Sequence, residues 1–227
     1  MTIIFGGNMK LQEIRQSERE ERKEERREHI LQCALDVFML KGLDQATMKD
    51  VADASEVGIA TLFRYFPTKK QLAIDCAATL WKREFMQLPI YLPRGYDDMD
   101  GITQFQQLLE IFLYHFQKTP EVFRFLEQFD NLVHNESVGF DQLDEVEDIL
   151  RTLKEPIYQA IEKGKSDGTI RHDFNVELFY MTSMHTLMSI IQKFVLRGEI
   201  VRSDSEVTGE AQIRLVIEMV CGFIRNK

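Results

Sequence analysis

The chain has 227 residues, 44% of them hydrophobic, which is enough to bury one large or two small cores. No stretch reaches 18 uninterrupted apolar residues, and the start lacks the basic and long apolar regions of a signal peptide, so we expect no membrane span and a cytoplasmic location. The net charge of −9 disfavours a strongly basic nucleic-acid binder, but the charge is uneven. Residues 1–70 hold 12 Lys/Arg and 12 Asp/Glu, whereas residues 71–227 hold 16 and 25.

Residues 10–29 are almost wholly charged and polar, with mixed signs at close spacing. Such a stretch is typical of an exposed extension of the next helix or of a frayed arm, and we assign residues 1–22 to a charged, disordered extension. The alternative is an arm that binds DNA through basic side chains, although the seven Glu residues of the stretch weaken it. The basic residues of such an arm would be Arg19, Arg22, Lys23, Arg26 or Arg27.

A helix is predicted from about Arg26 to Lys41, because a basic residue followed by Gly42 typically ends a helix. Its buried face would contain Leu31, Ala34, Leu35 and Phe38. This helix would cover the back of the two short helices that follow it.

The segment from Thr47 to Phe66 indicates two short helices joined by a tight turn. Thr47 followed by Asp50 is typical of a helix N-cap, at which the hydroxyl accepts a hydrogen bond from a free backbone N–H. Apolar residues then recur at helical spacing until residues 55–56 interrupt them, and a second apolar face follows with Leu62 and Phe66. The pattern predicts a helix-turn-helix.

Pro67 ends the second short helix, and Thr68 with Gln71 predicts a capping box at the start of the next. That helix should run through Trp81 to about Leu88.

The segment ADASEVGIATLFRYFPTKKQL (residues 52–72) resembles the DNA-binding signature of the TetR family of bacterial transcriptional regulators. The resemblance covers roughly residues 25–75 and implies a three-helix DNA-binding head in residues 23–80. It also implies a helical body in residues 81–227 that binds a small effector and forms a homodimer. The residues that carry it are Thr47, Gly58, Ala60, Thr61, Leu62, Phe63, Tyr65, Phe66 and Lys69.

Two residues depart from the family pattern. Glu56 stands at the turn position usually held by Gly, which costs about 1 kcal/mol if the backbone there needs a positive φ. Phe63 replaces a Tyr whose hydroxyl could reach a phosphate. These departures and the weak basic balance keep an alternative open, a helical dimeric ligand-binding or protein-interaction module whose helix-turn-helix no longer binds DNA.

We expect the second helix of the motif to enter the major groove of double-stranded operator DNA with its N-terminal residues. Apolar side chains there suit thymine methyl groups, whereas Lys49 and Arg64 are candidates for polar contacts. By resemblance, Lys69 holds the DNA backbone. The full set of predicted DNA contacts is Thr47, Lys49, Gly58, Ile59, Ala60, Thr61, Phe63, Arg64, Tyr65 and Lys69.

Beyond residue 80 the sequence shows only helical patterns, without alternating β-type runs or internal repeats, and we predict an all-α fold. Residues 89–101 are predicted to form a loop. The predicted helices cover about 102–118, 121–135, 140–166, 176–196 and 206–225.

Aromatic and methionine side chains are frequent in the body. Each one alone is best explained by core packing, but together they suit an adaptable pocket for an apolar ligand, such as the effector that the resemblance implies. The predicted effector-binding residues are Phe112, His115, Phe116, Phe129, Met181, Met184, His185 and Met188. The last two helices are apolar on more than one face, and by resemblance they form a two-fold four-helix interface. Such a homodimer would read a palindromic operator.

No catalytic or metal-binding constellation is present. The histidines are scattered, and there is no Gly-rich phosphate loop or nucleophilic Ser motif, so we predict no catalytic residues, no metal and no cofactor. Cys33, Cys76 and Cys221 lack metal-ligand spacing and are interpreted as small hydrophobic residues, with a redox-sensing thiol as the alternative.

Overall fold

A computed structural model describes residues 5–198, 200 and 202–226. Within these residues the fold is all-α, as predicted, and the bridge pairing is limited to an isolated antiparallel bridge between Ile170 and Arg225. The α-helices are α1 (Phe5–Lys41), α2 (Met48–Ala54), α3 (Ile59–Tyr65), α4 (Lys69–Phe85), α5 (Leu88–Tyr91), α6 (Gly101–Lys118), α7 (Pro120–Asn135), α8 (Asp144–Asp167), α9 (Val176–Arg197) and α10 (Gly209–Ile224). Short 3₁₀ helices cover Tyr96–Asp98 (η1), Phe140–Gln142 (η2) and Arg202–Ser205 (η3).

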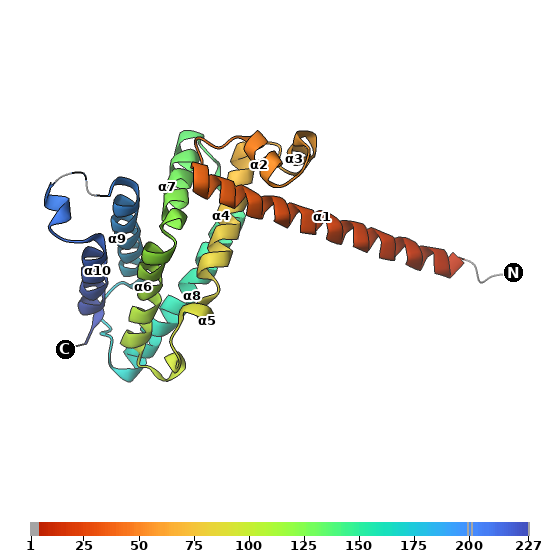
Figure 1. Cartoon of the computed structure of the whole chain (residues 1–227). Helices are drawn as coiled ribbons and strands as arrows, with labels where there is room; N and C mark the ends of the chain where they lie inside the picture. Colours follow the sequence, from red (N-terminus) through yellow and green to blue (C-terminus); the bar gives the residue numbers. More distant parts are fainter. Residues whose placement is uncertain (1–4, 199, 201, 227) are drawn as a thin grey trace.

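The helices form a head and a body (Figure 1). The C-terminal part of α1, with α2, α3 and the start of α4, makes up the head at one end of the molecule. In the body, α6 packs on α8 and α10, and α9 packs on α7 and α10. Helix α4 crosses the predicted domain boundary at residue 80 without a break and contacts α1, α7 and α8. The division into separate domains therefore stays a prediction.

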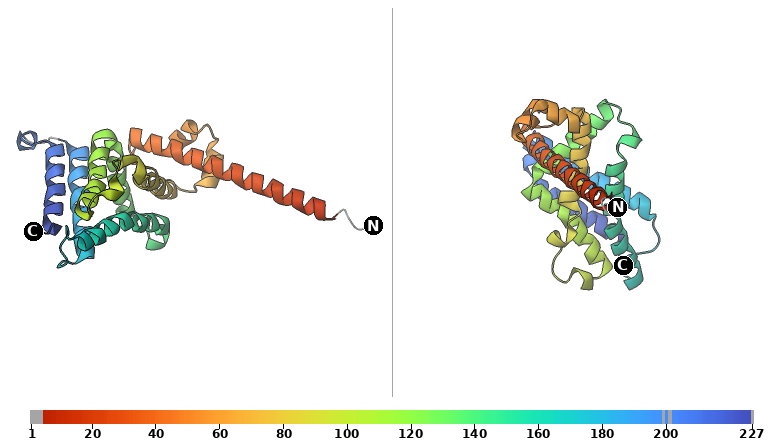
Figure 2. Two further views of the ribbon diagram at one scale, coloured as in Figure 1. Left: turned by 90° about the horizontal axis from the view of Figure 1, so that it is seen from below. Right: turned by 90° about the vertical axis from the view of Figure 1, so that its right-hand side faces the viewer.

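The N-terminal extension is helical rather than disordered from Phe5 onward, and α1 is continuous to Lys41. Residues 1–4 lie outside the described residues. The N-terminal half of α1 projects away from the rest of the molecule as a single helix (Figure 2). Between Ile14 and Arg26 the charged side chains are exposed, and the first fully buried residue among the described side chains is Ile30. The predicted buried face of this helix, Leu31, Ala34, Leu35 and Phe38, is in the core.

Helix α2 begins with the predicted cap. The Thr47 hydroxyl accepts a hydrogen bond from the Asp50 backbone N–H, and the Asp50 carboxylate accepts one from the Thr47 N–H, so both free donors are satisfied. The Asp50 carboxylate also accepts a 2.7 Å hydrogen bond from the Lys41 ammonium, which joins the end of α1 to the start of α2. Val51 and Ala52 are buried beneath this cap.

The turn between α2 and α3 places Glu56 at φ 54°, in the left-handed region that favours glycine. Helix α3 then begins after Gly58, whose backbone serves as an N-cap without a side-chain bond. Leu62 and Phe66 are fully buried, as their spacing predicts. The turn therefore has the conformation that glycine usually supplies, although a glutamate occupies it.

At the start of α4 only half of the predicted capping box forms. The Thr68 hydroxyl accepts from the Gln71 N–H, but the Gln71 side chain donates to the Asp75 carboxylate at 2.8 Å instead of returning to the cap. The helix ends at Phe85, and the predicted loop that follows contains α5 and η1.

In the body, α6 and α8 cross at close range. A Cβ on Gly101 would lie 2.0 Å from the Gly164 backbone nitrogen, so only glycine fits at this position. Helix α8 begins at Asp144, after η2, and contains Pro156 within its length. Helix α10 begins later than predicted because Thr208 is its N-cap, with its hydroxyl bonded to the Ala211 N–H.

Replacing Glu56 with Gly is expected to raise the free energy of unfolding by about 1 kcal/mol. A side chain in the left-handed region costs roughly 1–2 kcal/mol, and the greater freedom of glycine in the unfolded chain cancels part of that gain. Urea denaturation measures the change. The control Glu56→Ala removes the charge but keeps Cβ and should bring no such gain. Equal gains from both variants would contradict the backbone explanation and point to the charge.

The cap at Asp50 predicts a pH dependence of stability. The hydrogen bond from Lys41, followed by those from Thr47, lowers the pKa of the Asp50 carboxyl from 3.8 to about 2. A carboxyl with a lower pKa in the folded state stabilises the fold above its unfolded-state pKa and loses that contribution as the pH falls toward the folded-state value.

Asp50→Asn should therefore lower the urea midpoint at pH 6, and its difference from the parent should shrink steadily below pH 4. The matched control is Asp53→Asn, an exposed carboxylate on the same helix. A deficit in Asp50→Asn that is the same at pH 6 and pH 3 would show that the ionised carboxylate is not the stabilising species.

Candidate functional site

The first candidate site is the exposed face of α3. Gly58 and the first residues of the helix are open to solvent, and Ile59 and Phe63 keep 44% and 45% of their surface exposed. Large apolar side chains are ordinarily covered by packing, so their exposure here marks this face of α3 as a candidate binding surface. The exposed predicted residues of this face are Gly58, Ile59, Ala60, Phe63 and Arg64, and the half-buried ones are Thr61 and Tyr65.

The buried side of α3 fixes the orientation of this face. Leu62 and Phe66 lie in the core, and α3 packs on α2, which packs on α1. The guanidinium of Arg27 on α1 lies 5.5 Å from the centroid of the Phe66 ring. The exposed face of α3 is thus held by helices on its inner side.

Three further predicted DNA contacts lie at the edges of this face. Lys49 on α2 is exposed, and it has no ion pair with any residue that the structure describes. The Thr47 hydroxyl is already used in the cap of α2, where it also donates to the Asp50 carboxylate at 2.8 Å. The Lys69 ammonium donates to the Asp44 carbonyl at 3.2 Å, and burial lowers the pKa of this ammonium below its ordinary value.

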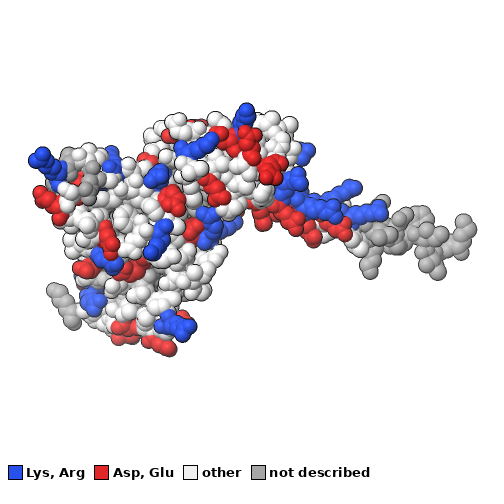
Figure 3. Space-filling model, in the orientation of Figure 1, with Lys and Arg blue, Asp and Glu red and all other residues white. Residues whose placement is uncertain are grey.

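The charge on the head is weak because acids neutralise part of the bases. Lys41 pairs with Asp50 at 2.7 Å, and Lys70 lies 3.7 Å from Glu136 on the C-terminal side of α7. On the visible face of the head, basic and acidic side chains alternate rather than gather (Figure 3). Electrostatic attraction of phosphates by the head alone should be modest.

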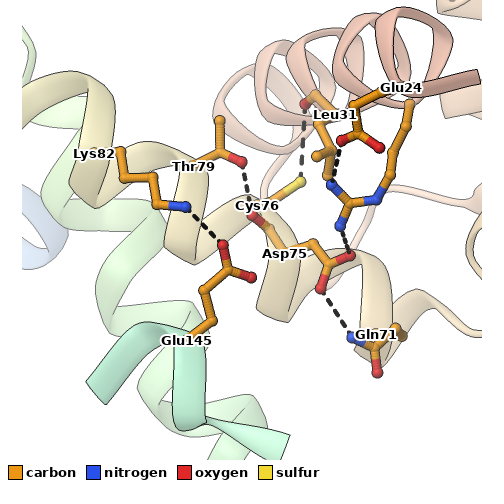
Figure 4. Close-up of polar contacts among 9 residues, drawn as sticks. Glu24, Leu31, Gln71, Asp75, Cys76, Thr79, Lys82 and Glu145 are labelled. Atoms are coloured by element: carbon orange, nitrogen blue, oxygen red, sulfur yellow. Dashed lines mark hydrogen bonds and ion pairs between the residues drawn. The ribbon is translucent and has the colours of Figure 1, made fainter. Parts of the chain in front are cut away.

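Helix α4 connects the head to the body through polar contacts on several sides (Figure 4). Its Asp75 carboxylate accepts a 2.6 Å hydrogen bond from Arg27 on α1, and its Lys82 donates to Glu145 at the start of α8, also at 2.6 Å. The Cys76 thiol lies 3.9 Å from the Leu31 carbonyl. These contacts were not predicted, because nothing in the sequence pairs residues so far apart.

Helix α7 also holds the head. The Gln128 side-chain oxygen accepts from the Leu43 backbone N–H at 2.6 Å, within the connection between α1 and α2. The rings of Phe38 and Phe125 stack with centroids 6.1 Å apart. Head and body are thus joined through both α4 and α7.

The second candidate site is a cavity of about 440 Å³ in the body. Its walls come from α4, α5, α6, α8 and α9 and are mainly apolar and aromatic, with Glu147, Arg151 and Lys154 as charged exceptions. Five of the eight predicted effector residues line it, namely Phe112, Met181, Met184, His185 and Met188.

The other three predicted effector residues do not line the cavity. His115 is fully buried between the Thr119 hydroxyl, 2.9 Å from Nδ1, and the Glu84 carbonyl, 3.0 Å from Nε2, and burial lowers its pKa. Phe129 stacks on Phe125 on the side of the body that faces the head. Phe116 is half-buried against the core. A pattern of apolar residues at helical spacing does not separate such core positions from cavity positions.

The remaining cavity residues were missed, and most belong to α4 and α8. The sequence of α8 is rich in charged residues and is typical of a solvated helix, so its few apolar residues did not indicate that it forms a wall of a cavity. Trp81 and Phe85 lie on α4, in the half that was assigned only to linking head and body. The missed lining residues include Trp81, Phe85, Leu150, Leu153, Lys154 and Tyr180.

Large apolar side chains are exposed on the last two helices. On α10 they recur every four residues, at Leu215, Met219 and Phe223, with exposed fractions of 54%, 65% and 55%. On α9, Leu178 is 66% exposed and Met181 is 39% exposed. A monomer rarely leaves such a run of apolar side chains in water.

The described residues also bear on metal binding, on thiol reactivity and on membrane crossing. Among the described residues, no group of three or more His, Cys, Asp and Glu is placed to hold a metal ion. Burial raises the pKa of all three cysteine thiols, so little reactive thiolate forms and the redox-sensing alternative loses support. None of the helices in the described part of the chain has the length and apolar character needed to cross a bilayer.

Comparison with known proteins identifies the head. The family described as bacterial regulatory proteins, tetR family, matches residues 30–76. The HTH-type transcriptional repressor KstR of Mycobacterium tuberculosis is 33% identical over 88 residues, which cover 39% of this chain and only 37% of that protein. The repressor KstR2 of Mycolicibacterium smegmatis is 22% identical over 204 residues, 85% of this chain and 89% of that one.

The fold of the whole chain has solved counterparts. The ketosteroid transcriptional regulator KstR2 of Mycobacterium tuberculosis superposes with a TM-score of 0.54, at 16% identity, over 89% of this chain and 96% of that one. At this identity the likeness concerns the fold, whereas the match at residues 30–76 concerns the sequence as well. The match at residues 30–76, the helical body behind it and these relatives support the TetR family of bacterial regulatory proteins as the family that this chain resembles.

Proposed function

We propose that this protein is a cytoplasmic, homodimeric transcriptional repressor that binds a palindromic operator and is released by a small, largely apolar effector. The observation that carries the proposal is the exposed face of α3, where Ile59, Ala60, Phe63 and Arg64 point outward while Leu62 and Phe66 anchor the helix. An exposed second helix of a helix-turn-helix is the element that enters the major groove.

The composition of that face favours a particular type of readout. Ile59, Ala60 and the methyl group of Thr61 suit thymine methyls, and only Arg64 offers the paired donors that recognise guanine. Because polar contacts to bases are few, part of the specificity should come from DNA shape and deformability.

The alternative, a helix-turn-helix that no longer binds DNA, rested partly on Glu56. The glutamate adopts the left-handed conformation that the turn requires, and α3 follows it with its apolar anchors buried. The substitution thus leaves the geometry of the motif intact. None of the known relatives described above favours a head without DNA binding.

The exposed apolar side chains on α9 and α10 support the dimer. Leu215, Met219 and Phe223 form one stripe along α10, and the same stripe on a second copy would cover it across a two-fold axis. Two heads related by that axis would read two half-sites about one helical turn of DNA apart, which requires a palindromic operator.

The cavity supports an effector with a large apolar body. Trp81, Phe112 and three methionines give adaptable apolar walls. Arg151 and Lys154 pair with Glu147 at 3.1 Å and Glu177 at 2.7 Å, so they would hold an acidic group of the ligand only by exchanging those carboxylates for it. The relative KstR2 is described as a ketosteroid regulator, and a ketosteroid is a rigid apolar molecule of suitable class. We therefore take ketosteroids and fatty acids as the first compounds to test.

Helix α4 supplies the coupling between the two sites. Its first turn follows the helix-turn-helix directly, and its last turns provide Trp81 and Phe85 to the cavity. A ligand that fits the cavity better when α4 is displaced would favour a head spacing that DNA disfavours. A coupling of about 1–3 kcal/mol, typical of allostery, would lower operator affinity roughly 5- to 150-fold.

Operator binding is tested by titrating the protein against labelled DNA from immediately upstream of its own coding region, beside a scrambled duplex. The combined variant Thr61→Ala, Tyr65→Ala, Lys69→Ala should lose at least about tenfold in affinity for the native fragment, equivalent to about 1.4 kcal/mol. The matched control Thr152→Ala, Tyr114→Ala, Lys118→Ala changes the same residue types on the body and should bind as the parent does.

Equal, weak binding of the parent to both duplexes would require a wider search among genomic fragments. A search that returned no preferred fragment would overturn the regulator proposal in favour of the head that does not bind DNA.

Effector binding is tested through Trp81, the single tryptophan of the chain, which lies in the cavity wall. A ketosteroid or a long-chain fatty acid that occupies the cavity should change the emission of Trp81 with saturation and lower operator affinity. Met184→Phe with Met188→Phe fills the cavity without adding a tryptophan and should weaken both effects. Met86→Phe, outside the cavity lining, is the control. Saturable binding with unchanged operator affinity would show that the cavity is not the regulatory site.

A further inference from the structure

The projecting part of α1 forms a surface of its own. Between Ile14 and His29 all side chains are exposed except that of Arg27, which is half-buried against the head. At 1.5 Å per residue, Ile14 lies about 24 Å along the helix from Ile30, the first buried residue. No other described helix packs along this segment (Figures 1 and 2).

The charges on this segment are separated by sign around the helix. At 3.6 residues per turn, Arg15, Arg19, Arg22 and Arg26 fall within an arc of about 60°, with Lys23 beside them. We call these five residues the basic stripe. Glu20, Glu21, Glu24 and Glu28 occupy the opposite side, whereas Glu18 and Glu25 flank Arg22. Figure 3 shows the two colours along opposite edges of the helix.

At a spacing of four residues this separation does not stabilise the helix in water, although four opposite-charge pairs lie three residues apart (Arg15–Glu18, Glu20–Lys23, Arg22–Glu25 and Glu24–Arg27). Opposite charges four residues apart support an isolated helix, and like charges at that spacing oppose it. Between residues 15 and 28 only Glu18 and Arg22 are opposite charges four apart. Seven pairs at this spacing carry like charges, four of them basic (Arg15–Arg19, Arg19–Lys23, Arg22–Arg26 and Lys23–Arg27) and three acidic (Glu20–Glu24, Glu21–Glu25 and Glu24–Glu28).

The basic stripe is also largely free of partners. Arg22 lies 3.6 Å from Glu18 and remains 76% exposed. Within the described part of the chain, Arg15, Arg19, Lys23 and Arg26 make no ion pair. Arg27, by contrast, is committed to Asp75 and Glu24 and belongs to the head rather than to the stripe. The stripe therefore presents basic side chains of which only Arg22 has an ion-pair partner among the described residues, although residues 15–28 hold equal numbers of basic and acidic residues.

We propose that the basic stripe binds the backbone phosphates of the DNA that flanks the half-site contacted by α3, an inference that rests on the proposed function. In Figure 1 the head with α2 and α3 lies above α1, and in Figure 3 the blue side chains follow the upper edge of the projecting helix. The basic edge of the projecting helix therefore lies on the side of α1 on which α2 and α3 lie. Guanidinium groups suit phosphates because they donate two parallel hydrogen bonds.

The acidic side of the helix does not cancel this attraction. A helix with its side chains is about 10–12 Å wide, and the Debye length at physiological salt is about 8 Å. Salt therefore screens most of the repulsion between phosphates on the basic side and the glutamates on the far side of the helix. The glutamates also make the interaction one-sided, because rotation of the helix by half a turn would bring them against DNA. The stripe thus supplies the phosphate attraction that the nearly neutral head lacks.

The test compares two variants that are matched in the number of substitutions and in the residue introduced. The basic-stripe variant is Arg15→Gln, Arg19→Gln, Arg26→Gln, and the control is Glu20→Gln, Glu21→Gln, Glu28→Gln on the opposite side. Glutamine is as good a helix former as the residues it replaces, and both sets remove like-charge pairs, so the helix should persist; circular dichroism checks this. Affinity is measured at several salt concentrations for the operator fragment, for a scrambled duplex of equal length, and for an operator trimmed to the half-sites.

Removing three of the five charges of the stripe should weaken binding to both full-length duplexes by about tenfold or more. It should also reduce the slope of log affinity against log salt by about 0.9 for each lost phosphate contact. The preference for operator over scrambled DNA should stay unchanged, because backbone contacts carry no sequence information. On the trimmed operator the variant and its parent should bind alike. The acidic-side control should bind at least as tightly as the parent on every duplex.

Unchanged affinity and salt slope in the basic-stripe variant would overturn the proposal while leaving the operator proposal intact. A change in oligomeric state without a change in DNA affinity would assign the stripe to protein contacts instead. A parent protein that binds the scrambled duplex as tightly as the operator, with both lost in the stripe variant, would support the stripe and contradict sequence-specific regulation.

Discussion

The structure depends on one helix that is buried along most of its length. Helix α4 places Leu72, Cys76 and Leu80 in the core, and it contacts α1, α7 and α8. Its small residues Ala73, Ala77 and Ala78 allow these neighbours to approach closely. The same helix begins at the helix-turn-helix and ends in the cavity wall. A rearrangement at either site that moves α4 must therefore also change how α4 packs on its neighbours.

The head could be predicted in detail because its signals are local. A cap such as Thr47 with Asp50, a turn at Glu56 and anchors four residues apart all act within a few positions of the chain, where sequence spacing equals spatial proximity. The helices of the body were predicted for the same reason. The half-formed cap at Thr68 shows the limit, since Gln71 found a better partner in Asp75, which also binds Arg27 of another helix.

The cavity could be predicted only in part because it is a property of packing. Met184 and Met188 line it, whereas Phe129, on an equally apolar helix face, meets Phe125 and the head. Periodicity assigns a residue to a buried face, but it does not say which helix lies opposite or whether the two faces fill the space between them. His115 illustrates this, because one of its hydrogen bonds joins α6 to Glu84 near the end of α4 and the other holds Thr119 at the end of α6, so a presumed ligand contact is a structural one.

The continuity of α1 has a mechanical consequence. The residues that anchor the head, from Ile30 to Phe38, and the residues that project from it belong to one uninterrupted helix, so the projecting segment must turn with the head as a rigid lever. A head rotation of about 10° would move Ile14, about 24 Å beyond the first buried residue, by about 4 Å. A shift too small to matter at the core of the head would thus be magnified at the tip of the helix.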